Sequence, residues 1–129
     1  MPVTKIEACT PRSQERIQSI IQAVYIAQRE ALQLPENDRN IRYIEHKAEH
    51  FCVPPDKSKE FILIEITLFA GRSLETKRTL YKMLVDNLTK LGIASNDISI
   101  ILYEVPLENW GIRGGVPASE IDLGFAVTI

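Results

Sequence analysis

The chain repeats itself, and this repeat constrains the fold more than any other feature of the sequence. The segment KIEACTPRSQER (5–16) aligns with EITLFAGRSLET (65–76) at an offset of 60 residues. The alignment pairs Arg12 with Arg72, and the serine after each arginine is also repeated. A fixed period of this length is typical of a duplicated supersecondary unit.

A second pair of segments repeats at nearly the same period. LQLPENDRNIRYIE (32–45) aligns with LGIASNDISIILYE (91–104) at an offset of 59 residues, which pairs Asp38 with Asp97. Two halves of the same plan, separated by a one-residue indel, indicate duplication. We expect one domain over 1–129, with repeats at about 1–52 and 60–110, a linker at 53–59 and a tail at 111–129.

Each half reads as strand, helix, strand. The expected elements are strands at 2–9, 40–46, 61–69 and 97–105, and helices capped by Ser13 and Ser73 that end by Pro35 and at a Gly92 C-cap. Segment 61–69 is almost continuously apolar, which is typical of a strand buried on both faces. Right-handed crossovers then give an α/β fold of duplicated β-α-β units, with one four-stranded sheet and two helices on one face. The tail adds a glycine turn and a short apolar strand.

Composition limits the classes of partner. The net charge is −2 and the basic residues are scattered among acids, so nothing indicates a nucleic-acid footprint. The longest apolar run is far below a membrane span, and the start lacks the features of a secretory signal. We therefore expect no nucleic-acid or membrane partner, and a cytoplasmic protein with reduced thiols at Cys9 and Cys52.

Pro2 is either the first residue of a strand or a reactive group. A strand tolerates proline at its first residue, where the missing amide donor costs little. If the initiator Met1 is removed, however, Pro2 carries a free secondary amine. Burial and a nearby guanidinium both disfavour the ammonium form, which favours a neutral base near physiological pH. Such a base can take a proton α to a carbonyl and return it elsewhere.

This combination of features resembles the tautomerase superfamily. The features are Pro2 after Met1, the repeated Arg-Ser turn, Asp38 before a strand and the stretch ENWGIRGG (108–115). The chain resembles fused members that hold two β-α-β units, near the malonate semialdehyde decarboxylase branch. The resemblance covers nearly the full length. It implies a catalytic proline amine, no cofactor and a homotrimer.

The resemblance also implies different roles for the two arginines. In fused members the turn of the second half lies beside the start of the first strand, so Arg72 would bind a substrate carboxylate next to Pro2. A guanidinium offers a planar fork for that purpose. Arg12 would face a second, inactive site where Phe61 or Ile62 replaces the amine. The alternative for Arg72 is a solvated residue at a helix start, where a cation is slightly unfavourable.

Three further residues are candidates, each with a structural alternative. Asp38 matches the acid that assists catalysis in the decarboxylase branch, but its segment PENDRN is also turn chemistry. Trp110 corresponds to the aromatic wall over the proline in small tautomerases, or else it belongs to the core. Arg113 contacts a second carboxylate, or it lies at the surface of a flexible glycine turn.

Together these residues predict a cofactor-free tautomerase that moves a proton on a small 2-oxo or 2-hydroxy-alkenoic acid. The alternative reaction is decarboxylation or hydration of a 3-oxo acid by protonated Pro2. This chain has a single arginine in AGR (70–72), whereas the turn of the decarboxylases resembles R-P-R, and this difference argues against the alternative reaction. A non-enzymatic oligomeric interaction module is the alternative of another class, and retention of Met1 would favour it. HKAEH (46–50) fits a zinc motif that requires a helix, but it ends a strand pattern, so we expect no metal site.

Overall fold

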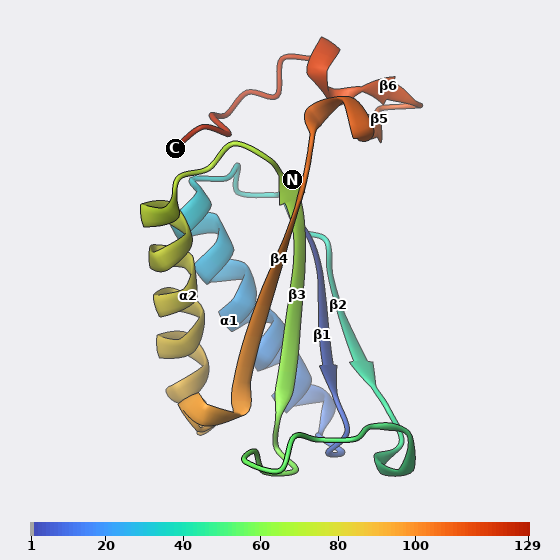
Figure 1. Ribbon diagram of the computed structural model, residues 1–129, viewed down its shortest axis with the longest axis vertical. Coiled ribbons are helices and arrows are strands. Elements are labelled where there is room, and N and C mark those ends of the chain that lie inside the picture. Colours follow the sequence, from blue (N-terminus) through green and yellow to red (C-terminus); the bar gives the residue numbers. More distant parts are fainter. Residues whose placement is uncertain (1) are drawn as a thin grey trace.

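Four strands form one sheet in the order β2-β1-β3-β4 in the computed structural model, which describes residues 2–129 (Figure 1). The strands are β1 (Val3–Ala8), β2 (Ile41–Glu45), β3 (Ile62–Phe69) and β4 (Ile98–Val105). β1 is parallel to β2 and β3 is parallel to β4, whereas β1 and β3 pair antiparallel at the centre of the sheet. This pairing confirms the predicted duplicated β-α-β fold and relates its halves by a pseudo-twofold axis.

The two helices, α1 (Gln14–Leu32) and α2 (Leu74–Thr89), lie side by side on one face of the sheet (Figure 1). Ser13 and Ser73 are the N-caps, as predicted, because each side chain accepts a hydrogen bond from a main-chain N–H in the first turn. The predicted C-cap is wrong. α2 ends at Thr89 with Lys90 as its C-cap, and Gly92 takes its left-handed φ of +90° in the tight turn that follows.

The core lies between the helices and the sheet. It is formed by apolar residues of both halves, among them Ile6, Ile20, Ile64, Leu84 and Leu88. Alternate residues of β3 are buried, while the intervening ones are only half-buried. The prediction that this strand is buried on both faces is therefore wrong for the chain alone, because the helices cover only one face.

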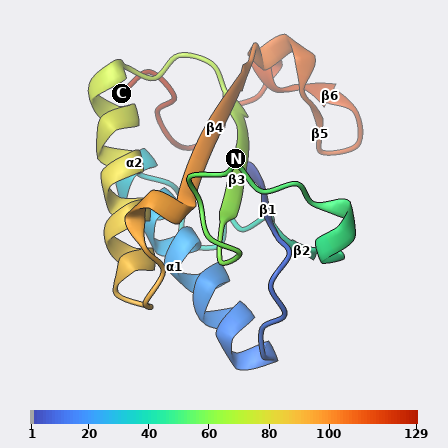
Figure 2. The same cartoon turned by 60° about the horizontal axis from the view of Figure 1, so that its bottom comes forward.

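The two ends of the sheet differ. The upper end, as drawn in Figure 1, holds residue 2, the loop 33–40, the ends of β3 and β4, and the tail 106–129. The linker 46–60 runs across the lower end (Figures 1 and 2). Met1, whose removal would free the Pro2 amine, lies outside the described residues.

The tail and the linker carry little regular structure. In the tail, β5 (Gly111–Ile112) and β6 (Val116–Pro117) flank the glycine turn, so the predicted tail strand is only a two-residue strand. In the linker, HKAEH follows β2 and continues as a 3-10 turn, η1 (Ala48–His50), not an α-helix. Across residues 2–129 no group of three His, Cys, Asp or Glu side chains could hold a metal ion. No helix in the same range is long and apolar enough to span a bilayer.

Candidate active site

A pocket of about 380 Å³ lies at the upper end of the sheet. One wall is polar and comes from the loop 33–40, which contributes Asp38 and Arg39. Arg113, in the turn between β5 and β6, adds a second cation to the lining. An opening with two guanidinium groups and one carboxylate at its wall suits a small acidic molecule.

Arg72 is a buried cation with unused hydrogen-bond donors. The residue is only 5% exposed, and its Nη1 donates to the Phe69 carbonyl at 3.3 Å. Within residues 2–129, Nε and Nη2 of Arg72 have no hydrogen-bond partner. Burial lowers the pKa of Arg72 from its ordinary value, and the charges of Asp38 and Glu104 partly offset that effect. Because buried donors are normally satisfied, the two unpartnered nitrogens make this guanidinium a candidate for binding an anion.

The turn that carries Arg72 is held from the neighbouring strand. Gly71 has a φ of +132°, a conformation that favours glycine, and its N–H donates to the Glu104 carboxylate at the end of β4. Lys77, in the first turns of α2, donates to the same carboxylate at 2.5 Å. Lys77 is the main reason that the pKa of Glu104 lies below its ordinary value of 4.5. Glu104 is therefore a positioning residue for the Arg72 turn.

Asp38 lies in a loop that α1 supports. The Asp38 N–H donates to the Pro35 carbonyl at 3.1 Å, which closes a turn. The hydroxyl of Tyr25 donates to the Glu36 carbonyl, and the Arg39 guanidinium lies 4.1 Å from the centre of the Tyr25 ring. These contacts fix the loop, and the Asp38 charge acts directly on Arg72. The structure thus brings Asp38 and Arg72 to one site.

Pro2 is buried at the same end of the sheet. The next residues of the chain fix its place, because the Thr4 N–H donates to the Asn40 carbonyl at 2.9 Å and Val3 pairs with Thr67 of β3. Two residues further along β3 is Phe69, which lines the pocket, as does Asn40. The register therefore places Pro2 at the end of the sheet that holds the pocket, although neither Pro2 nor Arg72 belongs to the described lining.

The apolar wall includes residues that the sequence reasoning did not single out. Phe69 and Phe125 stack with their ring centres 6.3 Å apart, and both line the pocket with Leu123. Trp110 packs its ring edge-on against Phe69 at 4.8 Å and donates its indole N–H to the Val105 carbonyl at 3.1 Å. Trp110 thus contacts the pocket through Phe69, and the described pocket lining does not include it.

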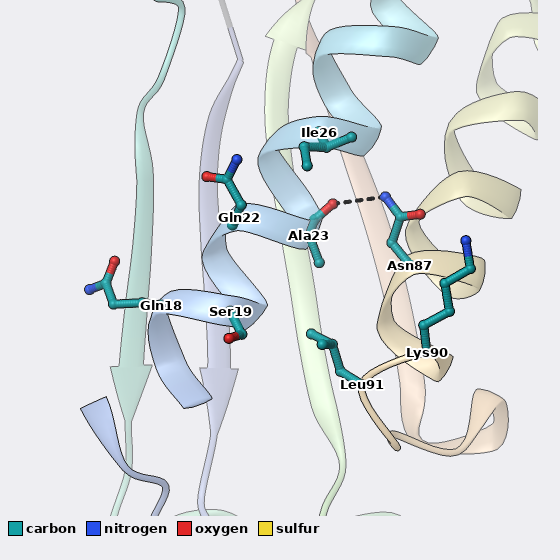
Figure 3. A pocket seen from close by; sticks show the side chains of 8 residues that line it. All are labelled: Gln18, Ser19, Gln22, Ala23, Ile26, Asn87, Lys90 and Leu91. Carbon is teal, nitrogen blue, oxygen red and sulfur yellow. Dashed lines mark hydrogen bonds between the residues drawn. The ribbon is translucent and has the colours of Figure 1, made fainter. Parts of the chain in front are cut away.

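A second hollow, of about 610 Å³, lies between α1 and α2 (Figure 3). The Asn87 amide donates to the Ala23 carbonyl across it at 3.1 Å. Its lining is mainly neutral, with Gln18, Gln22 and the single cation Lys90. A lining with one exposed lysine and no carboxylate, imidazole or thiol offers less for catalysis than a lining with paired charges, so the pocket at the upper end of the sheet is the candidate.

Comparison with known proteins shows the family of this chain. The family model described as "Tautomerase enzyme" matches residues 38–113, more than half of the chain. The chain belongs to the tautomerase family. The matched range includes Asp38, Arg72 and Arg113, and the duplicated fold is that of a tautomerase-type enzyme.

Relatives of this chain match most of its length. It is 29% identical to the probable tautomerase YusQ of Bacillus subtilis (strain 168) over 122 residues, which cover 89% of this chain and 95% of YusQ. The chain is also similar to a crystal structure of malonate semialdehyde decarboxylase, a protein described with decarboxylase and hydratase activities. The two superpose with a TM-score of 0.80 at 25% identity, over 87% of this chain and 92% of that chain. Pt0534 inactivated by 2-oxo-3-pentynoate (TM-score 0.83, 19% identity, 91% of this chain and 96% of that chain) shares the fold. So does the W0 fused 4-OT symmetric trimer (TM-score 0.83, 21% identity, 92% of this chain and 99% of that chain).

Proposed function

We propose that this protein moves a proton, without a cofactor, on a small 2-oxo or 2-hydroxy-alkenoic acid. The observation that carries the proposal is the buried Arg72 guanidinium, which has two unpartnered nitrogens and is acted on by the charge of Asp38, a residue of the pocket lining. A substrate carboxylate would accept hydrogen bonds from Nε and Nη2, the two nitrogens that have no partner within the described residues. Two parallel hydrogen bonds fix the plane of the carboxylate and hence the position of the carbon next to it.

The Pro2 amine is the base in this proposal. After loss of Met1 it takes a proton from the carbon or hydroxyl of the bound acid and returns it to the other end of the conjugated system. Burial of Pro2 and the charge of Arg72 both favour the neutral amine. The stacked rings of Phe69 and Phe125 exclude water from the same space. Arg113 is a second contact for an acidic substrate, and Trp110 holds Phe69 in place.

The experiment is the ketonisation of phenylenolpyruvate, followed by ultraviolet absorbance, for the wild type and Pro2→Ala. Intact mass must first show that Met1 is absent from both proteins. We expect a wild-type rate well above the rate in buffer and loss of most of it in Pro2→Ala. Equal rates in the two proteins, with Met1 absent, would mean that Pro2 is not the base for this substrate. If Met1 is retained, the amine mechanism is excluded and the non-enzymatic alternative is favoured.

A second reaction has support of its own. Asp38 acts electrostatically on Arg72, and the solved structure at 25% identity is that of a malonate semialdehyde decarboxylase. In this reaction protonated Pro2 is the acid, Arg72 holds the carboxylate and Asp38 orients water or substrate. Malonate semialdehyde turnover by the wild type and Asp38→Asn tests it. A decarboxylation rate above that of phenylenolpyruvate ketonisation, lost in Asp38→Asn, would replace the tautomerase proposal.

The assembly is proposed as a homotrimer. The fused 4-OT proteins of the same fold are trimers, and the open face of this sheet exposes Ile101 and Tyr103 at 40% and 45%. Apolar residues on an uncovered sheet face favour burial against further copies of the chain. Light scattering coupled to size exclusion is expected to give three times the chain mass, and a monomer at micromolar concentration would contradict the proposal. The cytoplasmic location stays a prediction.

A further inference from the structure

The lower end of the sheet is the pseudo-twofold counterpart of the active site. The repeat places Arg12 where the upper end has Arg72, and Asp97 where it has Asp38. The start of β3 there corresponds to the start of β1, with Ile62 in the place of Pro2. Ile62 supplies an ordinary amide nitrogen, so this end has the carboxylate-binding parts of the site without the amine.

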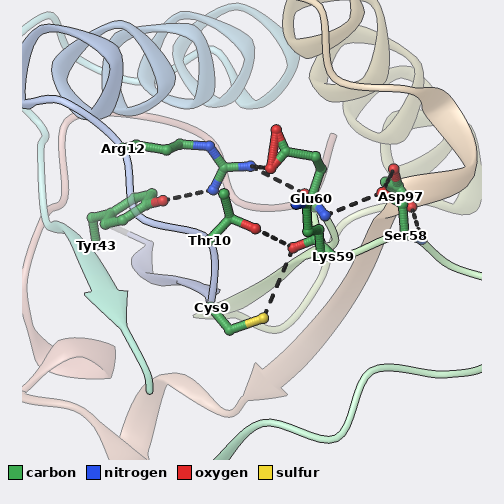
Figure 4. Close-up of polar contacts among 8 residues, drawn as sticks. All are labelled: Cys9, Thr10, Arg12, Tyr43, Ser58, Lys59, Glu60 and Asp97. Carbon is green, nitrogen blue, oxygen red and sulfur yellow. Dashed lines mark hydrogen bonds and ion pairs between the residues drawn. The ribbon is translucent and has the colours of Figure 1, made fainter. Parts of the chain in front are cut away.

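Arg12 has the partners that Arg72 lacks. Its Nη1 donates to the Tyr43 hydroxyl at 2.8 Å, and its Nη2 donates to the Glu60 carbonyl at 3.1 Å (Figure 4). The Glu60 carboxylate lies 3.8 Å from the same Nη2. The residue that corresponds to Tyr43 in the other half is Leu102, which has no hydroxyl to accept a hydrogen bond. Arg12 therefore has hydrogen-bond partners that Arg72 lacks among the described residues, because Tyr43 and Glu60 lie beside it.

The segment Ser58–Glu60 supplies most of these partners and fills the site. Ser58 donates its N–H and its hydroxyl to the Asp97 carboxylate at 2.8 and 2.6 Å. The Lys59 carbonyl accepts from the Thr10 hydroxyl. Figure 4 shows the three residues crossing the end of the sheet between Asp97 and Arg12. One short segment thus occupies both the acid, Asp97, and the arginine, Arg12, at the lower end of the sheet.

The chemistry of the contacts shows what the segment replaces. The Arg12 side chain is 5% exposed, while that of Glu60 is half-exposed, so a carboxylate already reaches a buried guanidinium from the solvent side. At the upper end the corresponding Arg72 guanidinium keeps two nitrogens without partners, and Asp38, whose charge acts on Arg72, lines a pocket. We infer that Ser58–Glu60 is an internal plug, which keeps a second site for small carboxylates, built around Arg12, closed. This inference depends on neither Pro2 nor catalysis.

The test opens the plug and measures carboxylate binding away from the upper site. Arg72→Met is the background, so that binding at the upper end is suppressed. In that background Ser58→Ala/Glu60→Ala removes the side-chain bond to Asp97 and the carboxylate at Arg12. Both proteins are titrated with pyruvate while backbone amide NMR signals of residues 9–13 and 57–61 are followed. Lys59→Ala is the matched control, because it leaves the main-chain carbonyl contact in place.

We expect saturable shifts in the opened protein and none in the Arg72→Met or Lys59→Ala proteins over the same pyruvate range. Adding Arg12→Met should weaken binding by at least about tenfold, the effect of losing one or more charge-assisted hydrogen bonds. The inference is overturned if the opened protein is folded and shows no saturable shift, or if pyruvate binds at residues 9–13 with the plug intact. If the double substitution prevents folding, Glu60→Ala alone is titrated, and absence of saturation there overturns the inference equally. The ketonisation assay of Pro2→Ala is unaffected by any of these results.

Discussion

Exchanging each arginine for methionine separates a ligand-binding cation from a structural one. Arg72→Met removes one hydrogen bond of 3.3 Å, which contributes about 1 kcal/mol. It also removes buried donors without partners, each of which costs about 1–3 kcal/mol in the folded state. Methionine fills much of the same volume. The gain from removing two unpartnered nitrogens outweighs the one lost hydrogen bond, so Arg72→Met should not lower the free energy of unfolding and should raise it by about 1 kcal/mol or more.

Arg12→Met should behave in the opposite way. It removes the bonds to the Tyr43 hydroxyl and the Glu60 carbonyl and leaves a carboxylate without its cation. Two hydrogen bonds to a charged group, partly exposed on one side, correspond to a loss of about 2–3 kcal/mol. Activity per folded molecule should be unchanged, because Arg12 lies at the opposite end of the sheet from the pocket.

The activity of Arg72→Met gives the second half of the comparison. Two charge-assisted hydrogen bonds to the substrate carboxylate contribute about 3–6 kcal/mol, which predicts a fall of about two to four orders of magnitude in kcat/KM. The assays are urea unfolding at one fixed protein concentration, since assembly makes stability concentration-dependent, and phenylenolpyruvate ketonisation. If Arg72→Met were as unstable as Arg12→Met and kept its kcat/KM, the assignment of the unpartnered nitrogens to a substrate would be refuted.

Three further changes follow from individual contacts. Gly71→Ala should lower both stability and activity, because the new Cβ would lie 3.0 Å from the Val127 carbonyl and the φ of +132° disfavours alanine; a stable, active variant in urea unfolding and ketonisation would contradict this. Lys77→Met should return the pKa of Glu104 toward its ordinary value of 4.5. The variant should therefore lose stability fully at pH values above 4.5, and this loss should vanish as the pH falls through the depressed pKa that Glu104 has in the wild type. Urea unfolding measures the loss, and a loss independent of pH would exclude the Lys77–Glu104 pair as its cause. Trp110→Phe should cost about 1 kcal/mol through the lost indole hydrogen bond while kcat/KM changes little, and a large loss of kcat/KM at unchanged stability would instead make Trp110 part of the pocket wall.

The duplicated fold could be predicted because its signals are local. Apolar periodicity, the two serine caps and the repeated arginines each lie within a few residues of the element that they specify. Gly92 was misplaced because a glycine signals a left-handed residue near a helix end but does not say how many residues of tight turn come first. Burial of β3 on both faces was expected from its apolar run, but coverage depends on how many layers pack on the sheet.

The two ends of the sheet could not be told apart from the residues alone. Arg12 and Arg72 are each followed by Ser-x-Glu, and only the resemblance to fused tautomerases assigned the site to Arg72. What distinguishes them is tertiary, namely the hydroxyl of Tyr43 and the linker residues around Glu60. The apolar wall was missed for the same reason, because Phe125 reaches Phe69 from an irregular tail that shows no periodicity.

The central claim is that the Pro2 amine and the Arg72 guanidinium belong to one site. The most direct measurement is the rate at which 2-oxo-3-pentynoate, an electrophilic 2-oxo acid, modifies the Pro2 nitrogen, with the adduct located by peptide mass spectrometry. Cys52→Ser is the common background, because an exposed thiol competes for the reagent. We predict a single adduct on Pro2 that forms at least about tenfold more slowly in Arg72→Met and at an unchanged rate in Arg12→Met. Equal rates of Pro2 modification in the Arg72→Met and Arg72-containing proteins, or modification elsewhere only, would contradict the claim.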